Sequence, residues 1–180
     1  MKKIEIEIEG TSSLLMNRFR DKQISEKTKK RAGEQKEMDV NEKLYENNGK
    51  PYIPARYLEG CMIEAAKQQK IVGKGKATYS KYVGATIHIE PEAILLDPGK
   101  WQPYTIAAVN PMTKGRMVVT RPRFDSWSLS FSVICEDDDI SVDTVEKILT
   151  YGGQFVGIGD WRPDKKGKFG KFRIVSCKEI

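Results

Sequence analysis

Glycines and basic residues are concentrated in a passage that runs from residue 152 to residue 170. Glycine lets a backbone approach a phosphate closely, and the N–H groups at such a turn can bind an anion. Lysine and arginine neutralise phosphates, and aromatic rings stack on bases without requiring a particular base sequence. The passage therefore predicts a site for single-stranded nucleic acid, formed by Gly157, Gly159, Trp161, Arg162, Lys165, Lys166, Lys168, Phe169 and Lys171.

The same passage has a structural explanation as well. Its glycines are typical of two turns that need a positive φ, with Trp161 as a packing residue. The spacing matches neither G-x-G-x-x-G nor a Walker loop, so nothing here indicates nucleotide hydrolysis. Anion binding and turn formation therefore both account for the glycines.

A second basic cluster lies on an expected strand. Arg121 and Arg123 are two residues apart, so both side chains point to one face of that strand, and Arg116 precedes them. This cluster would form a cationic stripe across the sheet, which suits nucleic acid. A solvated edge strand would carry the same residues.

Residues for catalysis or metal binding are few. His88 is the only histidine, and a strand residue with one hydrogen bond explains it as well as a general base does. Cys61, Cys135 and Cys177 form no C-x-x-C pair, so their spacing predicts neither a zinc site nor a disulfide framework. We expect no catalytic residue, no metal and no cofactor.

The composition sets broad limits on the class of protein. The chain has 180 residues, 39% of them hydrophobic, and a formal net charge of +6, which suits one domain and a polyanionic partner. A slightly basic surface without such a partner explains the charge equally well. With no secretory leader and no apolar run of about 18 residues, we expect a cytoplasmic protein without a membrane partner.

A long charged segment separates the first expected strand from the first expected helix. Residues 4–9 alternate isoleucine and glutamate, which is typical of a strand with one buried face. Residues 17–50 are rich in charge and poor in large apolar groups, so we expect an exposed, flexible arm there. Its most basic part, with Lys29, Lys30 and Arg31, would grip nucleic acid or form a solvated loop.

The remaining pattern alternates helices and strands. We expect a helix from residue 55 to about 69, a short strand over 85–89, and an irregular segment over about 91–110. Residues 116–124 and 127–135 would pair as a hairpin, Ser141 would cap a second helix, and residues 171–177 would form the last strand.

This order predicts an α+β fold of the ferredoxin-like or RRM type over residues 1–180. Such a β-α-β-β-α-β chain forms an antiparallel sheet with both helices on one face. The other face of the sheet stays free, and RNA-recognition domains use it to bind single strands.

Two segments resemble the CRISPR-associated RAMP superfamily. The segment Pro51-Tyr52-Ile53-Pro54-Ala55-Arg56-Tyr57-Leu58-Glu59-Gly60 is similar to the I-P-G-S-S-L-K-G segment that opens the first helix in that family. Gly157-Ile158-Gly159, followed by Gly167 and Gly170, resembles its C-terminal glycine-rich loop. The chain also resembles small bacteriophage and prophage proteins, especially over Arg121 to Phe124, at Trp127 and from Gly157 to Pro163.

The resemblance implies an RNA-recognition-type fold with a thumb inserted after the first strand. Residues 17–50 would be this thumb, and the glycine-rich loop would touch RNA phosphates. The chain departs from the family at Ala55, Arg56 and Glu59, where glycine, serine and lysine are favoured.

Three functions follow as hypotheses. The first is a non-catalytic protein that binds single-stranded RNA or DNA, as a homo-oligomer along the strand or within a ribonucleoprotein. The second is a protein-interaction module, phage-encoded, that engages a host complex. The third is a metal-independent endoribonuclease in which His88 or a lysine acts on the 2′-hydroxyl.

Overall fold

The protein is described here by a computed structural model that covers residues 1–18, 40–109 and 114–180. Within these ranges the fold is mixed α+β, as predicted, with three antiparallel sheets and three α-helices. It has ten strands in the described part of the chain, so it is richer in strands than the predicted β-α-β-β-α-β order. No helix among the described residues is long and apolar enough to cross a membrane.

The largest sheet, called the main sheet below, has the strand order β10-β1-β9-β5. Its strands are β1 (Lys2–Gly10), β5 (Ile87–Glu90), β9 (Ser128–Cys135) and β10 (Phe172–Glu179), and all neighbours are antiparallel. The isoleucines of β1 are buried and its glutamates are exposed, as the alternating pattern predicts.

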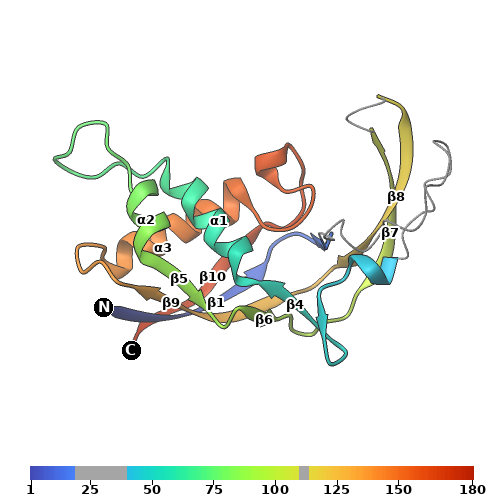
Figure 1. Cartoon of the computed structure of the whole chain (residues 1–180), viewed down its shortest axis with the longest axis horizontal. Coiled ribbons are helices and arrows are strands. Elements are labelled where there is room, and N and C mark those ends of the chain that lie inside the picture. The colour runs from blue at the N-terminus through green and yellow to red at the C-terminus, as the bar shows by residue number, and fades with distance from the viewer. Residues whose placement is uncertain (19–39, 110–113) are drawn as a thin grey trace, which may run out of the picture.

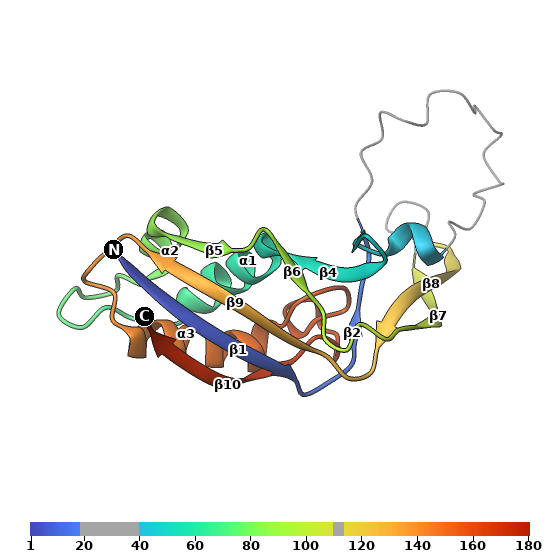
Figure 2. The ribbon, with the colours of Figure 1, turned by 90° about the horizontal axis from the view of Figure 1, so that it is seen from below.

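Helices cover one face of the main sheet. They are α1 (Ala55–Ala66), α2 (Ser80–Thr86) and α3 (Val142–Tyr151), and they lie above the sheet in Figure 1. In Figure 2, which shows the molecule from below, the strands lie in front of the helices. The Ser141 hydroxyl accepts from the Thr144 N–H and caps α3, as predicted.

The glycine-rich passage continues directly from α3. A π-helical turn, η3 (Gly152–Val156), follows α3, and a short 3-10 helix, η4 (Pro163–Lys165), precedes β10. Residues 157–170, called the glycine-rich loop below, lie on the same side of the main sheet as the helices (Figure 1).

The second sheet has the order β2-β8-β7, with β2 (Leu14–Leu15), β7 (Gln102–Val109) and β8 (Arg116–Phe124). The predicted hairpin of residues 116–124 with 127–135 is therefore wrong, because β8 pairs with β7 and β9 joins the main sheet. Phe124 and Trp127 are both buried, and the Trp127 indole donates to the Ser12 carbonyl at 2.8 Å. The chain between them thus passes from one sheet to the other instead of reversing.

The third sheet, β3-β4-β6, is formed by β3 (Glu46–Asn47), β4 (Lys50–Pro54) and β6 (Ala93–Leu95). It includes part of the segment predicted to be irregular. A 3-10 helix, η2 (Val40–Lys43), precedes it, and Leu44 and Tyr45 are buried. The C-terminal end of the predicted arm therefore belongs to the folded core, whereas Lys29, Lys30 and Arg31 lie outside the described residues.

Candidate functional site

The free face of the main sheet carries acidic and hydroxyl side chains. Glu5, Glu7 and Glu9 are exposed on β1 and lie opposite serines of β9. Arg173 donates to Glu9 at 2.8 Å, and Lys3 lies 3.6 Å from Glu90. RNA-recognition domains place aromatic rings on this face. The chemistry of the face in this protein does not match that mode of binding.

A cavity of about 450 Å³ lies on the other side of the sheet, between α1 and the glycine-rich loop. Asn17 reaches it from the N-terminal region. Helix α1 contributes Arg56, Tyr57, Gly60, Cys61 and Glu64, and the segment after α3 contributes Val156, Gly157, Ile158, Gly159, Asp160 and Arg162. Helix α1 and the segment that follows α3 thus form the two walls of this cavity.

Close packing fixes the backbone of the loop wall. Gly157, Gly159 and Gly170 have φ values of 72°, 81° and 70°, where a side chain would be strained. The Gly157 N–H donates to the Gly152 carbonyl at 2.7 Å, and the Gly170 N–H donates to the Ser13 carbonyl at 2.8 Å. These glycines therefore have the structural role that turn formation predicts, and these two N–H groups are engaged within the protein.

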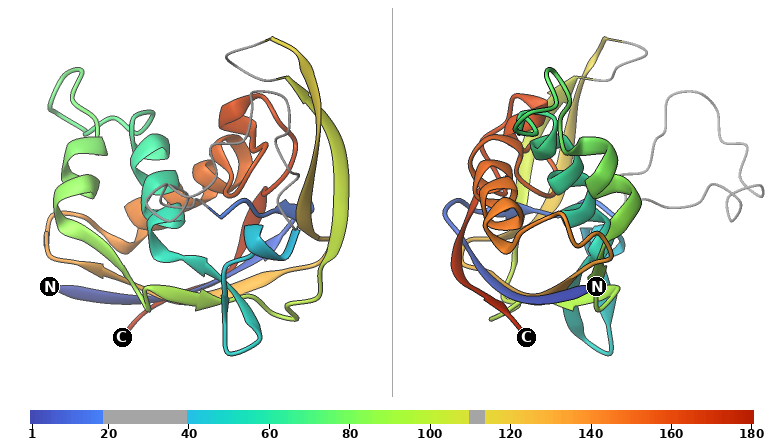
Figure 3. Two further views of the ribbon diagram at one scale, coloured as in Figure 1. Left: turned by 45° about the vertical axis from the view of Figure 1, so that its right-hand side comes forward. Right: turned by 90° about the vertical axis from the view of Figure 1, so that its left-hand side faces the viewer.

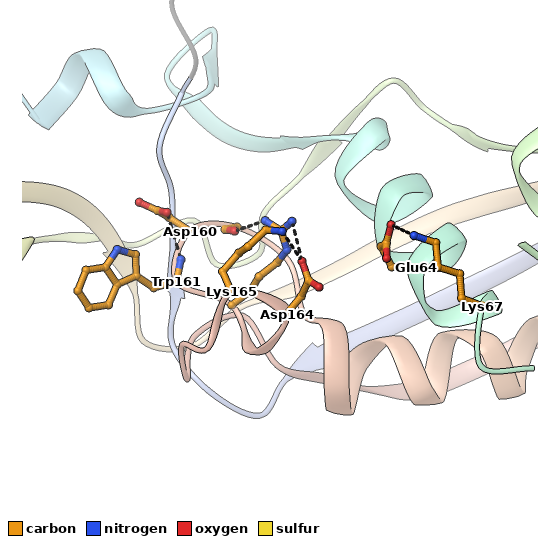
Figure 4. Close-up of polar contacts among 8 residues, drawn as sticks. Glu64, Lys67, Asp160, Trp161, Asp164 and Lys165 are labelled. Atoms are coloured by element: carbon orange, nitrogen blue, oxygen red, sulfur yellow. Dashed lines mark hydrogen bonds and ion pairs between the residues drawn. The ribbon is translucent and has the colours of Figure 1, made fainter. Parts of the chain in front are cut away.

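Arg162 projects from the loop wall, where its own loop holds it. Its guanidinium donates to the Gly159 carbonyl at 3.2 Å and to Asp164 at 3.3 Å. Lys165 pairs with the same carboxylate at 3.0 Å (Figure 4). Hydrogen bonding from Lys165 and the nearby charge of Arg162 hold the pKa of Asp164 below its ordinary value.

Arg56 projects from the helix wall and contacts a tyrosine cluster. Its guanidinium donates to the Tyr45 hydroxyl at 3.2 Å, and Tyr57 donates to the same hydroxyl at 3.4 Å. Burial and this hydrogen bond raise the pKa of Tyr57, so that its hydroxyl stays protonated at neutral pH. Burial also raises the pKa of Cys61 to about 12, which makes this thiol a poor nucleophile.

The two carboxylates of the cavity lining have basic partners nearby. Glu64 accepts from Lys67 at 2.6 Å on the surface of α1 (Figure 4). Asp160 accepts from Arg121 of β8 at 2.9 Å, with exposed side-chain fractions of 26% and 15%. The Arg121–Asp160 pair also joins the glycine-rich loop to the second sheet.

Aromatic contacts strengthen the junction between the loop and the second sheet. Phe169 is 6% exposed, and its ring centroid lies 5.7 Å from that of Tyr104 on β7. The Arg123 guanidinium lies 5.1 Å from the same Tyr104 ring. Figure 3 shows the β7–β8 ribbon rising beside the loop. Phe169 therefore packs against protein, and its burial leaves little ring surface for stacking on a base.

Asp125 ties three segments together through one carboxylate. It accepts from Arg123 at 2.6 Å, from Ser13 at 2.9 Å and from Gln102 at 2.6 Å. The hydrogen bond from Arg123, followed by that from Ser13, lowers the pKa of Asp125 below 3.8. Because the folded pKa is lowered, this stabilisation is present above the unfolded value and is lost as pH falls through the folded pKa.

We expect the Asp125 carboxyl, followed by NMR during a pH titration, to show a midpoint below 3.8, the ordinary value for aspartate. Arg123→Gln removes the charged donor and should move the midpoint back toward that ordinary value. Asp138, whose carboxylate pairs with the N-terminal amine and not with Arg123, serves as the internal reference within the same spectra. A wild-type midpoint at or above 3.8 would contradict the hydrogen bonds assigned to Asp125.

The structure places the predicted site residues in different environments. Arg162, Gly157 and Gly159 line the cavity, and Lys165, Lys166 and Lys168 are exposed on the glycine-rich loop. Arg121 and Arg123 share a face of β8 as predicted, but each is paired with a carboxylate. Trp161 is half-buried, and its ring points away from Asp164 and Lys165 in Figure 4.

Two further predicted residues lie elsewhere. Arg116 is exposed at the start of β8, and the backbone N–H of Lys171 donates to the Ser12 hydroxyl.

Nine residues of the cavity lining were not predicted from the sequence as site residues, among them Asn17, Arg56, Tyr57 and Glu64. The helical pattern placed Tyr57 and Glu64 on polar faces of α1 without indicating what those faces meet. No signal in the sequence alone indicated that this face of α1 meets the glycine-rich loop.

The histidine considered as a general base lies apart from the cavity. His88 is exposed on β5, where it pairs with Ile134 across the main sheet. Among the described residues, no group of three or more histidine, cysteine, aspartate or glutamate side chains is placed to hold a metal ion.

Comparison of the chain with protein-family models and with curated protein sequences finds no match.

Proposed function

We propose that this protein binds single-stranded nucleic acid, RNA foremost, without catalysing its cleavage. The observation that carries the proposal is that Arg56 and Arg162, from separate segments, line one cavity of about 450 Å³. Guanidinium groups bind phosphate through charge-assisted hydrogen bonds. The hydrogen bond that Arg56 donates goes to a tyrosine hydroxyl, that of Tyr45, and not to a carboxylate.

The exposed lysines of the glycine-rich loop support the same function. Lys165, Lys166 and Lys168 are exposed beside the cavity wall that carries Arg162. A row of such cations attracts the sugar-phosphate backbone and releases counterions when it binds. The cavity and the loop lysines together thus favour a strand that runs over the loop, rather than over the acidic free face of the main sheet.

The strand order supports a proposal about the fold family. In the main sheet, α1 lies between β1 and β5 in the chain, and α3 lies between β9 and β10. The order β10-β1-β9-β5 is the one expected for a ferredoxin-like core, with β2–β4 and β6–β8 as additions to it. The meeting of residues 51–60 with the glycine-rich loop favours kinship with the RAMP superfamily, and with it action within a ribonucleoprotein.

The test is fluorescence anisotropy with labelled single-stranded RNA, single-stranded DNA and duplex DNA at two salt concentrations. We expect a preference for single strands, with log affinity falling linearly as log salt rises. Replacing Lys165, Lys166 and Lys168 by glutamine should reduce the salt slope by about 2, since each phosphate contact on a single strand contributes about 0.7.

The matched control replaces Lys3, Arg173 and Lys178 by glutamine. These residues are also basic and lie on the free face of the main sheet or at its rim, so the net charge falls by the same amount. This variant should keep the wild-type salt slope. Equal slopes for the two triple variants would contradict the proposed location, and no binding of any oligonucleotide would contradict the proposed function.

One observation favours a protein-interaction module as the second candidate function. Val109 and Val118 are 60% and 61% exposed near the end of the β7–β8 ribbon. Exposed apolar side chains that lie close together mark protein contacts in many proteins. A complex with a protein partner that forms without nucleic acid, survives nuclease treatment and is lost in Val118→Ser would favour this candidate over the first.

A further inference from the structure

A second cavity, of about 570 Å³, adjoins the first and shares Arg56 with it. It lies where the first turn of α1 meets β4 and the segment between β5 and β6, elements that are neighbours in Figures 1 and 2. Tyr45, Tyr52, Glu59 and Glu92 contribute to its lining. Its volume falls within the range of about 300–1,000 Å³ that is typical of small-molecule sites.

The tyrosines give this cavity a rigid aromatic wall. Tyr45 is 5% exposed, and its ring centroid lies 5.6 Å from that of Tyr52 and 5.8 Å from that of Tyr57. The Tyr52 N–H donates to the Tyr45 carbonyl at 3.0 Å, which fixes the backbone. Tyr52 itself is only partly buried. An aromatic side chain held in this way can stack on a planar ring at little cost in conformational entropy.

The second cavity is more acidic than the first, because it is lined by two carboxylates and one guanidinium, whereas the first is lined by two of each. Glu59 accepts from the Ile89 N–H at 3.1 Å, which orients its carboxylate, and Glu92 is exposed. Carboxylates repel phosphates but accept hydrogen bonds from amino groups, as they do from the amino group of cytosine. A nucleotide strand therefore fits with a phosphate on the Arg56–Arg162 side and a base on the Glu59–Glu92 side.

We propose that the second cavity binds a nucleobase that carries an exocyclic amino group, stacked on Tyr52. The amino group donates to Glu59 or Glu92, and Arg56 between the two cavities contacts the phosphate of the same strand. This inference rests on the proposed function, because it assigns the base of a strand whose backbone occupies the first cavity. Uracil has no exocyclic amino group and turns carbonyl oxygens toward these carboxylates, so it should bind less tightly.

The experiment compares labelled homopolymeric A, C and U ribo-oligonucleotides of equal length by fluorescence anisotropy. For the wild-type protein we expect A and C to bind about tenfold more tightly than U. Glu92→Ala should reduce this preference with little change in U binding. Tyr52→Leu should weaken binding of A and C by about tenfold, through the loss of stacking. Glu7→Ala, which removes an exposed carboxylate from the free face of the main sheet, should leave the preference unchanged.

The outcomes separate this inference from the proposed function. Equal affinities for A, C and U, or a preference that both Glu92→Ala and Tyr52→Leu leave intact, would overturn the base site while salt-dependent binding still supports the first cavity. Because Glu92 is exposed, its substitution tests the site even if Tyr52→Leu fails to fold. Absence of binding to all three oligonucleotides would overturn the proposed function itself.

Discussion

Gly170→Ala is expected to destabilise the folded protein by about 3 kcal/mol, because it combines backbone strain with a steric clash. Gly170 has a φ of 70°, and a Cβ there would collide with the backbone carbonyl of Ile158. The Ile158 carbonyl cannot withdraw easily, since the Ile158 N–H donates to the Gly170 carbonyl at 3.0 Å. Urea denaturation followed by circular dichroism measures the change in the free energy of unfolding.

Gly60→Ala is the matched control, with an effect of opposite sign. Gly60 lies within α1, and a Cβ there would meet no described side chain, and no backbone beyond its own helix, within 4 Å. Alanine in a helix is favoured over glycine by about 0.5–1 kcal/mol, so this variant should be more stable than the wild type. A Gly170→Ala protein with wild-type stability would contradict the close packing of the glycine-rich loop.

The local elements of the fold could largely be predicted from the sequence. The alternation of isoleucine and glutamate in residues 4–9 predicted β1 and its buried face, and Ser141 was correctly predicted as the cap of α3. These features depend on neighbours in the chain: side chains alternate along a strand, and a cap bonds an N–H three residues away. Residue propensity and spacing therefore predict the position of a strand, its buried face and the start of a helix.

The pairing of β8 could not be predicted in the same way. Residues 116–124 have a strand pattern that fits any partner, and proximity in the chain favoured residues 127–135. The actual partner is set by distant contacts, among them Arg121 with Asp160 and the burial of Trp127 beneath the loop at Ser12. Such contacts leave no periodic signal in the sequence, so the second and third sheets were missed.

In the candidate site, too, the residues predicted from composition differ from those that depend on distant contacts. The glycine-rich loop was predicted from its composition, because the sequence shows both its basic residues and the glycines that adopt positive φ values in the structure. Arg56 was not predicted as a site residue, because it lines the cavity only when α1 packs against a loop that is distant in the chain. The predicted element order left the other face of the main sheet free for RNA, and the structure places the exposed side chains of Glu5, Glu7 and Glu9 on that face.

Gly60→Leu should abolish most nucleic-acid binding without loss of stability. Leucine is a good helix former, and position 60 has space for a Cβ. Because Gly60 lines the first cavity, the added side chain would occupy the space between Arg56 and Arg162. A hydrogen bond to a charged group contributes about 1.5–3 kcal/mol, so blocking even one should weaken binding of single-stranded RNA by about tenfold or more.

Gly84→Leu provides the comparison at a helical glycine outside the cavity. Gly84 lies in α2, where a Cβ would meet only ordinary contacts with Ile63, at 3.6 Å or more. It should retain wild-type affinity in the same anisotropy measurement, and thermal melts should show that both leucine variants remain folded. If Gly60→Leu binds as tightly as Gly84→Leu, the strand does not enter the cavity, and the exposed lysines of the loop would have to bind it from outside.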